Sequence, residues 1–385
     1  MKIAQFDDSY FPVIDGVAIV IDNYTRILNA KGHESFVVSI DIEDAKDDYG
    51  YRVLRFKSIT NPVNKIYRWP MCWFDSKMKK KLKKEPMDLI HIHTPFMVGH
   101  YAIRLAKKRK IPSIVTFHTK FYYDLLEALH VSFFAKIGLY YIMKVYKKAD
   151  YVIGVSEYTR EVLKSYGYKG EVKVIPHGCD LVKPADAEER IRAIKEGLEL
   201  KDEEIFLFVG AHNEKKNIRK IYDALEVYKV KKPNFKLIMV GSGLHEKKIQ
   251  KYGKKLGLED NIIYMGRIAD REKLINLYLA ADLFLFPSIY DTFGLVVKEA
   301  AVCETPSVVV RNHGPSEGII HNKNGFLCQN DVGSISDTIE VAMSDKERLK
   351  AVGEEAARTL PKTWEEVVTE VETFYQEILN EKSSL

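Results

Sequence analysis

Short apolar runs alternate with longer segments of helical periodicity along almost the whole chain, and this alternation constrains the fold more than any other feature. Such alternation is typical of parallel sheets built from βαβ units. In the first half, strands are predicted at Lys2–Phe6, Ser35–Ile40, Asp88–His93, Ser113–Phe117, Tyr151–Val155 and Val172–Ile175. In the second half, they are predicted at Ile205–Val209, Leu237–Val240, Ile262–Met265, Asp282–Phe286 and Ser307–Val310.

A polar, strand-poor segment from Asp180 to Glu204 separates the two series. Because 385 residues exceed the usual size of one domain, each series is predicted to form a doubly wound α/β domain. The predicted domains are residues 1–180 and 181–362, followed by a C-terminal segment, 363–385. Apolar residues recur with helical spacing from Trp364 to Ile378, which predicts an amphipathic helix that packs on another element.

The composition favours a cytoplasmic protein. No apolar run approaches the roughly 18 residues of a membrane span, and the N-terminus reads as a strand rather than a signal peptide. The four cysteines, Cys72, Cys179, Cys303 and Cys328, are scattered, without a CxxC pair or a histidine cluster at ligand spacing. We therefore expect reduced thiols and no metal site.

Basic charge is concentrated in the first half of the chain. Residues 1–180 carry 29 Lys and Arg against 20 Asp and Glu, whereas residues 181–385 carry 30 against 34. The densest run lies between Lys77 and Lys84. Such a run is a solvated helix face, or it binds anionic lipid or nucleic acid.

The loops that follow strands are the candidate sites, because ligands of parallel sheets bind beyond the carboxyl ends of the strands. The first loop runs from Asp7 to Gly16, where a glycine allows close approach and a helix start favours an anion. The chain has neither G-x-G-x-x-G at this opening nor a G-x-x-x-x-G-K-[ST] loop. This argues against a dinucleotide dehydrogenase or a P-loop protein.

The most informative stretch runs from Phe284 to Ala301. A buried strand ends near Pro287, Asp291 follows it, and a helix that contains Glu299 begins near Gly294. Spacing alone leaves two interpretations open. Either the two carboxylates hold a ligand beside an anion at the helix start, or Asp291 caps the helix and Glu299 is solvated.

This stretch resembles the E-x7-E motif of the retaining GT-B glycosyltransferases of family 4, typically P-S-x-x-E-T-F-G-L-V-x-x-E-A. The resemblance covers essentially the whole chain, and the other matching segments are Phe11-Pro12 with Gly16-Val17, Asp88–His93, Thr116–Thr119, Val174–Asp180, Met265–Arg267 and Asn324–Leu327. It implies two Rossmann-like domains that face each other across a cleft, with the C-terminal helix crossing back to the first. Two positions depart from the pattern: Asp291 replaces a glutamate, and Ala211 stands where the family has an arginine.

The resemblance also implies residue roles, with the acceptor on the first domain and the nucleotide sugar on the second. Glu299 would hold the ribose hydroxyls, Asp291 and His118 would contact the sugar, and Lys216 would neutralise the diphosphate. The catalytic residues would then be His118, Asp291 and Lys216. The implied donor-binding set is Gly16, Gly210, Lys216, Arg267, Asp291, Thr292, Phe293, Gly294, Leu295, Val296 and Glu299. With these charges at the diphosphate, neither a metal nor a cofactor is expected.

The acceptor is predicted from aromatic residues beside the lysine run, a combination that suits a lipid headgroup boundary. The acceptor and membrane residues are predicted to be Trp69, Trp73, Phe74, Lys77, Lys79, Lys80, Lys81, Lys83 and Lys84. The segment His118–Leu126 is similar to the corresponding region of the bacterial diacylglycerol glucosyltransferases. The other interpretation is that the aromatic residues belong to the core and the lysines keep a helix solvated.

The sequence therefore predicts a retaining hexosyltransferase that moves a hexose from UDP-glucose or UDP-galactose to a lipid such as diacylglycerol or a glycosyl-diacylglycerol. It would act as a peripheral protein on the inner face of the cell membrane, without a nucleic-acid partner. One alternative is a family 4 enzyme whose acceptor is a polysaccharide, a protein or a small soluble molecule. A second is a weak or inactive relative that serves as a partner subunit.

Overall fold

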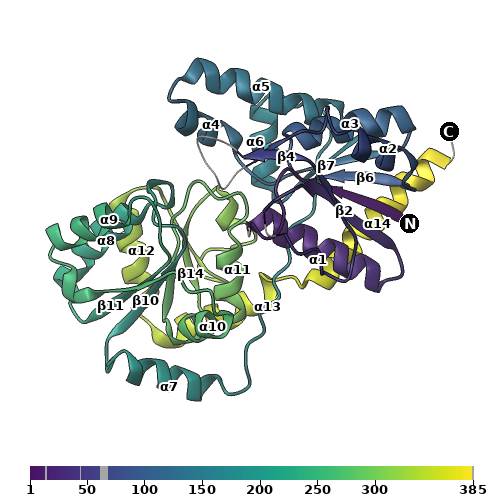
Figure 1. Ribbon diagram of the computed structural model, residues 1–385. Helices are drawn as coiled ribbons and strands as arrows, with labels where there is room; N and C mark the ends of the chain where they lie inside the picture. The colour runs from purple at the N-terminus through teal and green to yellow at the C-terminus, as the bar shows by residue number, and fades with distance from the viewer. Residues whose placement is uncertain (14, 44, 61–67, 384–385) are drawn as a thin grey trace. The chain divides into compact units, whose positions relative to one another are not determined.

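The computed structural model describes residues 1–13, 15–43, 45–60 and 68–383, with the backbone alone at Ser383, and divides into two compact units (Figure 1). The first unit comprises Met1–Gly178 and Thr363–Leu385, and the second comprises Cys179–Lys362. Helix α7 (Ala187–Gly197) lies in the polar segment that separates the two strand series, and it belongs to the second unit. The α/β fold class predicted from the sequence is confirmed in each unit.

The first unit has a seven-stranded parallel sheet in the order β3-β2-β1-β6-β7-β8-β9. Its strands are β1 Lys2–Phe6, β2 Glu34–Ile40, β3 Val53–Phe56, β6 Leu89–Ile92, β7 Ser113–Phe117, β8 Tyr151–Gly154 and β9 Lys173–Val174. A separate antiparallel pair is formed by β4 (Ser58–Thr60) and β5 (Arg68–Pro70). The six predicted strands are present, whereas β3, β4 and β5 were not predicted.

The helices of the first unit cover both faces of its sheet. They are α1 Gly16–Ala30, α2 Ser76–Lys84, α3 Met97–Arg109, α4 Phe121–Leu129, α5 Ser132–Lys148, α6 Glu157–Ser165 and α14 Trp364–Ser383. One core joins α1 and α14 to strand residues such as Ile3 and Leu89, and the other joins α2, α3 and α5 to residues such as Ala4 and Ile90. Alternate strand residues thus face opposite layers.

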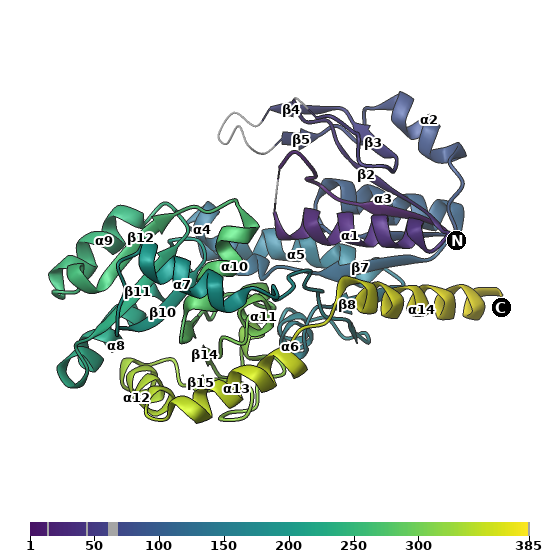
Figure 2. The ribbon, with the colours of Figure 1, turned by 90° about the horizontal axis from the view of Figure 1, so that it is seen from below.

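The C-terminal helix α14 packs on the first unit, although it ends the chain. Figures 1 and 2 show it in yellow, and its contacts are with α1 at the opposite end of the sequence. Trp364, Val368 and Tyr375 point into the core that α14 shares with α1. The amphipathic pattern of this segment therefore has the partner that the resemblance implied.

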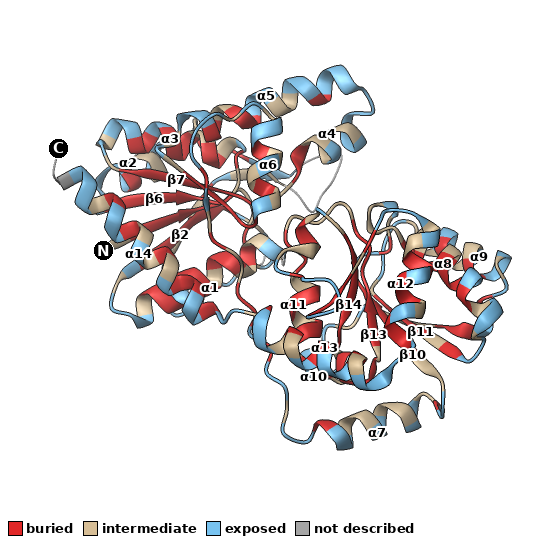
Figure 3. Ribbon diagram, turned by 180° about the vertical axis from the view of Figure 1, so that it is seen from behind, coloured by how far each residue is buried: buried red, intermediate tan, exposed pale blue. Residues whose placement is uncertain are grey.

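The second unit has a six-stranded parallel sheet in the order β12-β11-β10-β13-β14-β15. Its strands are β10 Glu204–Val209, β11 Phe235–Val240, β12 Ile262–Gly266, β13 Leu283–Leu285, β14 Ser307–Val310 and β15 Phe326–Cys328. Its further helices are α8 Ile218–Lys231, α9 Glu246–Lys255, α10 Arg271–Ala280, α11 Leu295–Val302, α12 Val332–Met343 and α13 Lys346–Thr359, with 3-10 turns η1 Glu214–Lys216, η2 Glu259–Asn261 and η3 Gly314–Ser316. The strands of both sheets are buried, as Figure 3 shows in red. Of these strands, only β15 was not predicted.

The strand orders fix where a ligand can bind in each unit. In each sheet the order reverses at a single point, between β1 and β6 in the first unit and between β10 and β13 in the second. Loops diverge beyond the carboxyl ends of the strands at such a switch point and leave room for a ligand.

Candidate donor site and histidine cluster

An ion pair lies at the switch point of the second unit. Lys216 ends η1, which follows β10, and Asp291 lies in the loop after β13, the neighbouring strand. Lys216 Nζ is 2.6 Å from Asp291 Oδ1, and both side chains are largely buried. The sheet order therefore brings together two of the three predicted catalytic residues, which are far apart in the sequence.

Both carboxylate oxygens of Asp291 are engaged. The Ser288 hydroxyl donates to Oδ2, while the Tyr290 amide donates to the Ser288 oxygen at 3.3 Å. Helix α11 is capped not by Asp291 but by Gly294, which has φ of 73°, in the left-handed region. The interpretation of Asp291 as a helix cap is therefore wrong, and its carboxylate instead fixes the Lys216 ammonium.

The loop that enters α11 is held by close backbone packing. A Cβ atom added to Gly314 would lie 2.2 Å from the carbonyl carbon of Thr292, and one added to Gly294 would lie 2.9 Å from Pro315 Cα. Phe293 is buried beside this loop. Because the first N–H groups of a helix have no intrahelical acceptor, Leu295 and Val296 present donors suited to an anion.

Glu299 lies in the second turn of α11 and is held by a buried tyrosine. The Tyr278 hydroxyl donates to Glu299 Oε2 at 3.0 Å. Burial raises the pKa of Glu299, and the tyrosine hydrogen bond partly offsets this. The interpretation of Glu299 as a solvated residue is therefore wrong. Its neighbour Lys298 is also buried, which lowers the lysine pKa to about 8, and its ammonium donates to the Glu317 carbonyl at 2.7 Å.

Two other predicted donor residues, Gly210 and Arg267, follow strands β10 and β12. Gly210 directly follows β10, so close to β11 that a Cβ atom on Gly241 would lie 2.0 Å from the Gly210 oxygen. Arg267 follows β12 at the sheet edge and is exposed. No contact between Arg267 and the Lys216–Asp291 pair occurs among the described residues. The structure thus gathers most of the predicted donor set at one place and leaves Arg267 apart.

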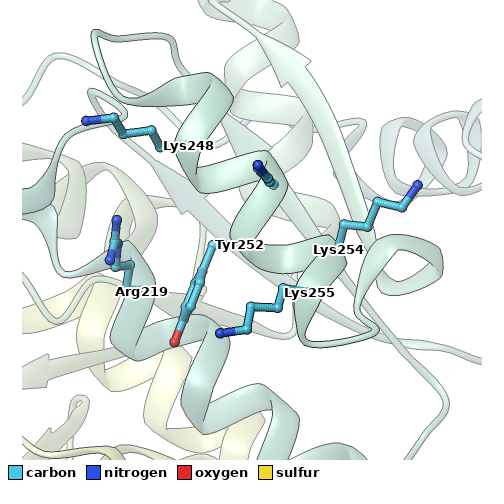
Figure 4. A pocket seen from close by; sticks show the side chains of 6 residues that line it. Arg219, Lys248, Tyr252, Lys254 and Lys255 are labelled. Carbon is cyan, nitrogen blue, oxygen red and sulfur yellow. The ribbon is translucent and has the colours of Figure 1, made fainter.

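Two cations that follow Ala211 in the sequence, Lys215 and Arg219, lie in different surroundings. Lys215 Nζ lies 4.5 Å from the centroid of the Tyr290 ring, in the loop that carries Asp291. Arg219, in contrast, pairs with Glu214 at 3.1 Å and lies 5.2 Å from the Tyr252 ring. Figure 4 shows Arg219 with Tyr252 in a hollow of about 490 Å³ whose other lining residues are Lys248, Lys251, Lys254 and Lys255. Lys215, not Arg219, therefore lies beside the donor loop.

The first unit holds His118 within a histidine cluster at the carboxyl ends of β6 and β7. His118 Nε2 lies 3.2 Å from His93 Nδ1, and its ring stacks on that of His177 with 5.3 Å between centroids. His91 completes the cluster, 4.2 Å from His93 between ring centroids. Burial lowers the pKa of all four rings, to about 3 for His91 and about 4 for His177, so the rings are neutral at pH 7.

A neighbouring glutamine determines which nitrogen of His118 carries the hydrogen. His93 Nε2 lies 2.9 Å from Gln5 Oε1, which is an acceptor, so His93 carries its hydrogen on Nε2 and accepts at Nδ1. His118 must then donate from Nε2 to His93. The acceptor nitrogen of His118 is consequently Nδ1.

Gly16 begins α1, close to the switch point of the first unit. Asp15 caps the helix, because its Oδ1 accepts from the Ala18 amide at 2.8 Å. A Cβ atom on Gly16 would meet no protein atom within 4 Å, so packing does not require a glycine there. The same loop contains Asp8, which binds the Val98 amide and whose pKa burial raises to about 6. Ile14 of this loop lies outside the described residues.

The predicted membrane residues lie on α2 and around it. A hollow of about 440 Å³, which we name the α2–α3 hollow, is lined by Trp73, Ser76, Lys79, Lys80, Lys83, Tyr101, Arg104, Leu105 and Lys108. Trp73 forms part of its wall, with its ring 5.7 Å from that of Tyr101. Trp69, on β5, and Phe74 are exposed, while Lys77, Lys81 and Lys84 lie on α2 outside the hollow.

Sequence reasoning missed Ser288, Tyr278 and His93, which hold the predicted residues in place. Ser288 is part of the P-S element of the matched motif, so a signal for it was present. Tyr278 contacts Glu299 from α10, and nothing in the sequence indicates that contact. In the described part of the chain, no group of three His, Cys, Asp or Glu side chains could hold a metal ion, and no described helix is long and apolar enough to cross a membrane.

Two units with doubly wound parallel sheets, and with charged side chains at a switch point, define the fold class of the GT-B glycosyltransferases. Among solved structures, the chain is similar to Anabaena HepE in complex with UDP and glucose, with a TM-score of 0.77, 20% identity and coverage of 98% of this chain and 99% of that one. It is also similar to sucrose-phosphate synthase of Thermosynechococcus elongatus, with a TM-score of 0.79, 21% identity and coverage of 98% and 99%.

Comparison of the sequence itself identifies the family. Residues 14–183 match the model described as Glycosyltransferase Family 4, and residues 189–359 match Glycosyl transferases group 1. The chain is 29% identical to the alpha-monoglucosyldiacylglycerol synthase of Streptococcus pneumoniae, over 81% of this chain and 71% of that protein. It is 25% identical to the synthase of the same name from Acholeplasma laidlawii, over 100% and 98%. The protein is a glycosyltransferase of family 4 with the GT-B fold.

Proposed function

We propose that the protein is a retaining hexosyltransferase that moves a hexose from UDP-glucose or UDP-galactose to a membrane lipid such as diacylglycerol or a glycosyl-diacylglycerol. The observation that carries the proposal is the Lys216–Asp291 pair at the start of α11, in a chain similar over most of its length to two monoglucosyldiacylglycerol synthases. The HepE structure, which has the same fold, holds UDP and glucose. This supports a uridine nucleotide as the carrier.

The donor diphosphate would lie at the start of α11. The amides from Thr292 to Val296 would donate to its oxygens, and Lys216 would supply a positive charge that Asp291 already holds in place. Negative charge grows on the diphosphate as the bond between the sugar and the phosphate breaks. A cation and amides positioned before that step stabilise its transition state.

Two further residues would position the donor. Glu299, oriented by Tyr278, would accept hydrogen bonds from the ribose hydroxyls. Lys215, beside Tyr290, would supply the second cation that the family obtains from the arginine missing at Ala211. We place His118 against the sugar, where its acceptor nitrogen Nδ1 would bind a hydroxyl.

The acceptor would be reached at an anionic membrane surface on the cytoplasmic side. The α2–α3 hollow combines five cationic side chains, four lysines and Arg104, with the rings of Trp73 and Tyr101. Cations attract lipid phosphates, and aromatic rings favour the headgroup region. Both features support a lipid acceptor over a soluble one.

Labelled UDP-glucose, UDP-galactose and GDP-mannose, each incubated with the full chain and with vesicles that contain diacylglycerol, a glucosyl-diacylglycerol or neither lipid, would test the proposal. We expect labelled glycolipid only with a uridine nucleotide and one of these two acceptors, and an α-linked product from the α-linked donor. Nucleotide release without glycolipid would contradict the lipid acceptor, and a β-linked product would contradict retention. Lys216→Ala serves as the inactive control.

A further inference from the structure

Large apolar side chains are concentrated on the surface of the α4–α5 hairpin. Eighteen large apolar side chains are exposed in the described part of the chain, and seven of them lie within residues 129–141. We name these seven the hairpin stripe: Leu129, Val131, Phe133, Phe134, Ile137, Tyr140 and Tyr141, each between 43% and 64% exposed. A dense exposed apolar patch on one element marks an interaction surface.

The hairpin is built to keep this stripe outward. The opposite side of α5 packs into the unit through Ala135, Ile142 and Tyr146. Helix α4 approaches α5 so closely that a Cβ atom on Gly138 would lie 3.0 Å from Leu125 Cδ2. Since the core and α4 already occupy the other sides of α5, the stripe has no partner to pack on within its own hairpin.

The charges around the stripe indicate what covers it. Helix α5 has four lysines and no acidic residue, so the hairpin has an excess of basic charge although α4 contains Asp124 and Glu127. Lys144 Nζ lies 4.6 Å from the centroid of the Tyr140 ring. A second copy of the same surface would bring like charges together, which disfavours self-association. Aromatic rings interleaved with lysines on an apolar helix face instead match the boundary of an anionic bilayer.

The stripe is continuous with the α2–α3 hollow. His100 on α3 contacts Tyr141, with 3.9 Å between ring centroids and 3.2 Å from His100 Nε2 to the Tyr141 carbonyl oxygen. One helical turn later on α3, Arg104 lies 5.6 Å from the Trp73 ring at the wall of the hollow. Figures 1 and 2 show α5, α3 and α2 in succession. An apolar tip and a basic hollow thus share one surface.

We propose that the α4–α5 hairpin inserts its stripe among the acyl chains of an anionic bilayer, while the lysines of α5 and of the α2–α3 hollow bind the lipid phosphates. Insertion and charge then act as two membrane signals on one surface, the combination that stable peripheral attachment requires. Helix α4 begins three residues after His118, so the inserted element leads directly to the candidate catalytic histidine. The role of this insertion in bringing the protein to its acceptor rests on the proposed lipid acceptor, whereas membrane binding by the hairpin does not.

Vesicle co-sedimentation with three matched variants of the full chain tests this surface. The hairpin variant is Phe133→Ser/Phe134→Ser/Ile137→Ser, the charge variant is Lys79→Gln/Lys80→Gln/Lys83→Gln, and the control is Val227→Ser/Val230→Ser/Leu244→Ser, which removes exposed apolar residues of the second unit. On phosphatidylglycerol–phosphatidylcholine vesicles at high salt, we expect the hairpin variant to bind at least about 10-fold more weakly than the unmodified protein. The charge variant should lose mainly the binding that salt removes, and the control should bind as the unmodified protein does.

Insertion is measured directly with a fluorescent label. All four native cysteines are buried, so an environment-sensitive dye reacts selectively at Phe134→Cys, with Val230→Cys as the control. We expect the dye at position 134, but not at 230, to become more fluorescent on vesicles and to be quenched by lipids with nitroxide groups on the acyl chains. Circular dichroism checks that each variant is folded. Unchanged vesicle binding of a folded hairpin variant, or a dye at 134 that stays in water on bound protein, would overturn the inference.

The outcomes separate this inference from the proposed function. If the protein inserts the hairpin but transfers no hexose to diacylglycerol or a glucosyl-diacylglycerol, the membrane surface is supported and the proposed acceptor is contradicted. If the protein glycosylates either lipid but the hairpin variant binds vesicles and reacts normally, the acceptor is supported and the hairpin surface is contradicted.

Discussion

Lys216 and Glu299 are suited to different parts of a bound donor. Asp291 and Ser288 hold the ammonium at the start of α11, so the cation is in place before a donor arrives. A charge that needs no rearrangement at the reacting step contributes more to the rate than one that must be recruited. Glu299, bound to Tyr278, is suited to a part of the donor whose charge does not change during the reaction.

This difference predicts distinct kinetic effects for two substitutions. Lys216→Ala should lower kcat by about 10²-fold or more, because the growing diphosphate charge loses its cation. Glu299→Gln should mainly raise the donor KM, because it weakens ground state and transition state equally. Steady-state kinetics with varied donor concentration measures both, with Lys229→Ala, on α8, as a control. Near-normal kcat and KM for Lys216→Ala would place the phosphate elsewhere.

The residues of this site were partly predictable. The matched motif indicated Asp291 and Glu299, and the resemblance to the family implied Lys216. Their 2.6 Å contact depends on β10 and β13 being neighbours, which no local pattern reports. For the same reason the Tyr278 contact with Glu299 was missed, and the cap interpretation of Asp291 was wrong because Gly294 starts the helix.

His91 leads to a prediction about pH and stability. Burial lowers its pKa to about 3, so below the ordinary value of about 6.5 the unfolded chain binds a proton that the folded protein does not. The free energy of unfolding must then fall as the pH decreases, by up to about 1.4 kcal/mol per pH unit for this group. We expect the stability difference between the unmodified protein and His91→Gln to shrink by about 2 kcal/mol between pH 7 and pH 5.

Urea unfolding followed by tryptophan fluorescence measures this difference, because Trp69, Trp73 and Trp364 all belong to the first unit. Effects of other titrating groups are common to both proteins and cancel in the comparison. A stability difference that does not change with pH would show that His91 is not held neutral by burial.

At the scale of elements, α14 is attached to the first unit by packing, by a buried hydrogen bond and by the pairing of Glu372 with Lys31 and His33. Its apolar side covers α1 and the sheet, and the Tyr375 hydroxyl lies 2.6 Å from His91 Nδ1. Gly178 lets the chain pass close to the first residue of α14, since a Cβ atom there would lie 2.7 Å from Trp364 Cα. The helix is therefore as much part of the first core as α1 is.

Removing a buried contact of α14 should destabilise the whole first unit. Ile378 is 1% exposed, so Ile378→Ala should lower the free energy of unfolding by about 2–5 kcal/mol. The exposed Gln376 lies on the same helix, and Gln376→Ala should change it by about 0.5 kcal/mol or less. Tryptophan fluorescence during urea unfolding compares the two. Equal effects of both substitutions would mean that α14 is not docked.

Most of the strands that sequence patterns predicted are buried runs of four or more residues, although β9 and β13 are shorter. The missed strands, β3, β4, β5 and β15, have three or four residues each. Such segments carry too little apolar pattern to be distinguished from loops, and their pairing partners define them as strands. The sequence pattern also could not predict which apolar side chains are exposed. The aromatic residues of α5 fit a core helix equally well, and the tertiary structure leaves seven apolar side chains of the hairpin exposed.

At the scale of the whole molecule, the distribution of charge along the chain suits the proposed tasks. Residues 1–180 are basic and carry the α2–α3 hollow, while residues 181–385, which are slightly acidic, carry the Lys216–Asp291 pair of the proposed donor site. In the proposed mechanism, the counter-charges for the diphosphate come from the protein itself, from Lys216, Lys215 and the start of α11. This scheme therefore does not call on a divalent cation.

Activity should accordingly survive removal of divalent cations. We expect glycolipid formation in excess EDTA to stay within about 2-fold of the untreated rate, because the protein's own cation stabilises the leaving diphosphate. A parallel reaction with added Mg²⁺ or Mn²⁺ is the comparison. Abolition of turnover by EDTA and its restoration by either ion would contradict this account.

The position of α14 has a consequence for the order in which the protein can be completed during synthesis. Residues 1–178 leave the ribosome before residues 179–362, yet the face of their sheet that contains Ile3, Leu89 and Ile114 is covered by α14, which follows both segments in the sequence. The second unit, 179–362, is complete before that helix appears. The first unit is therefore completed only after the second has been translated, and until α14 emerges it carries an apolar face that nascent-chain chaperones can bind.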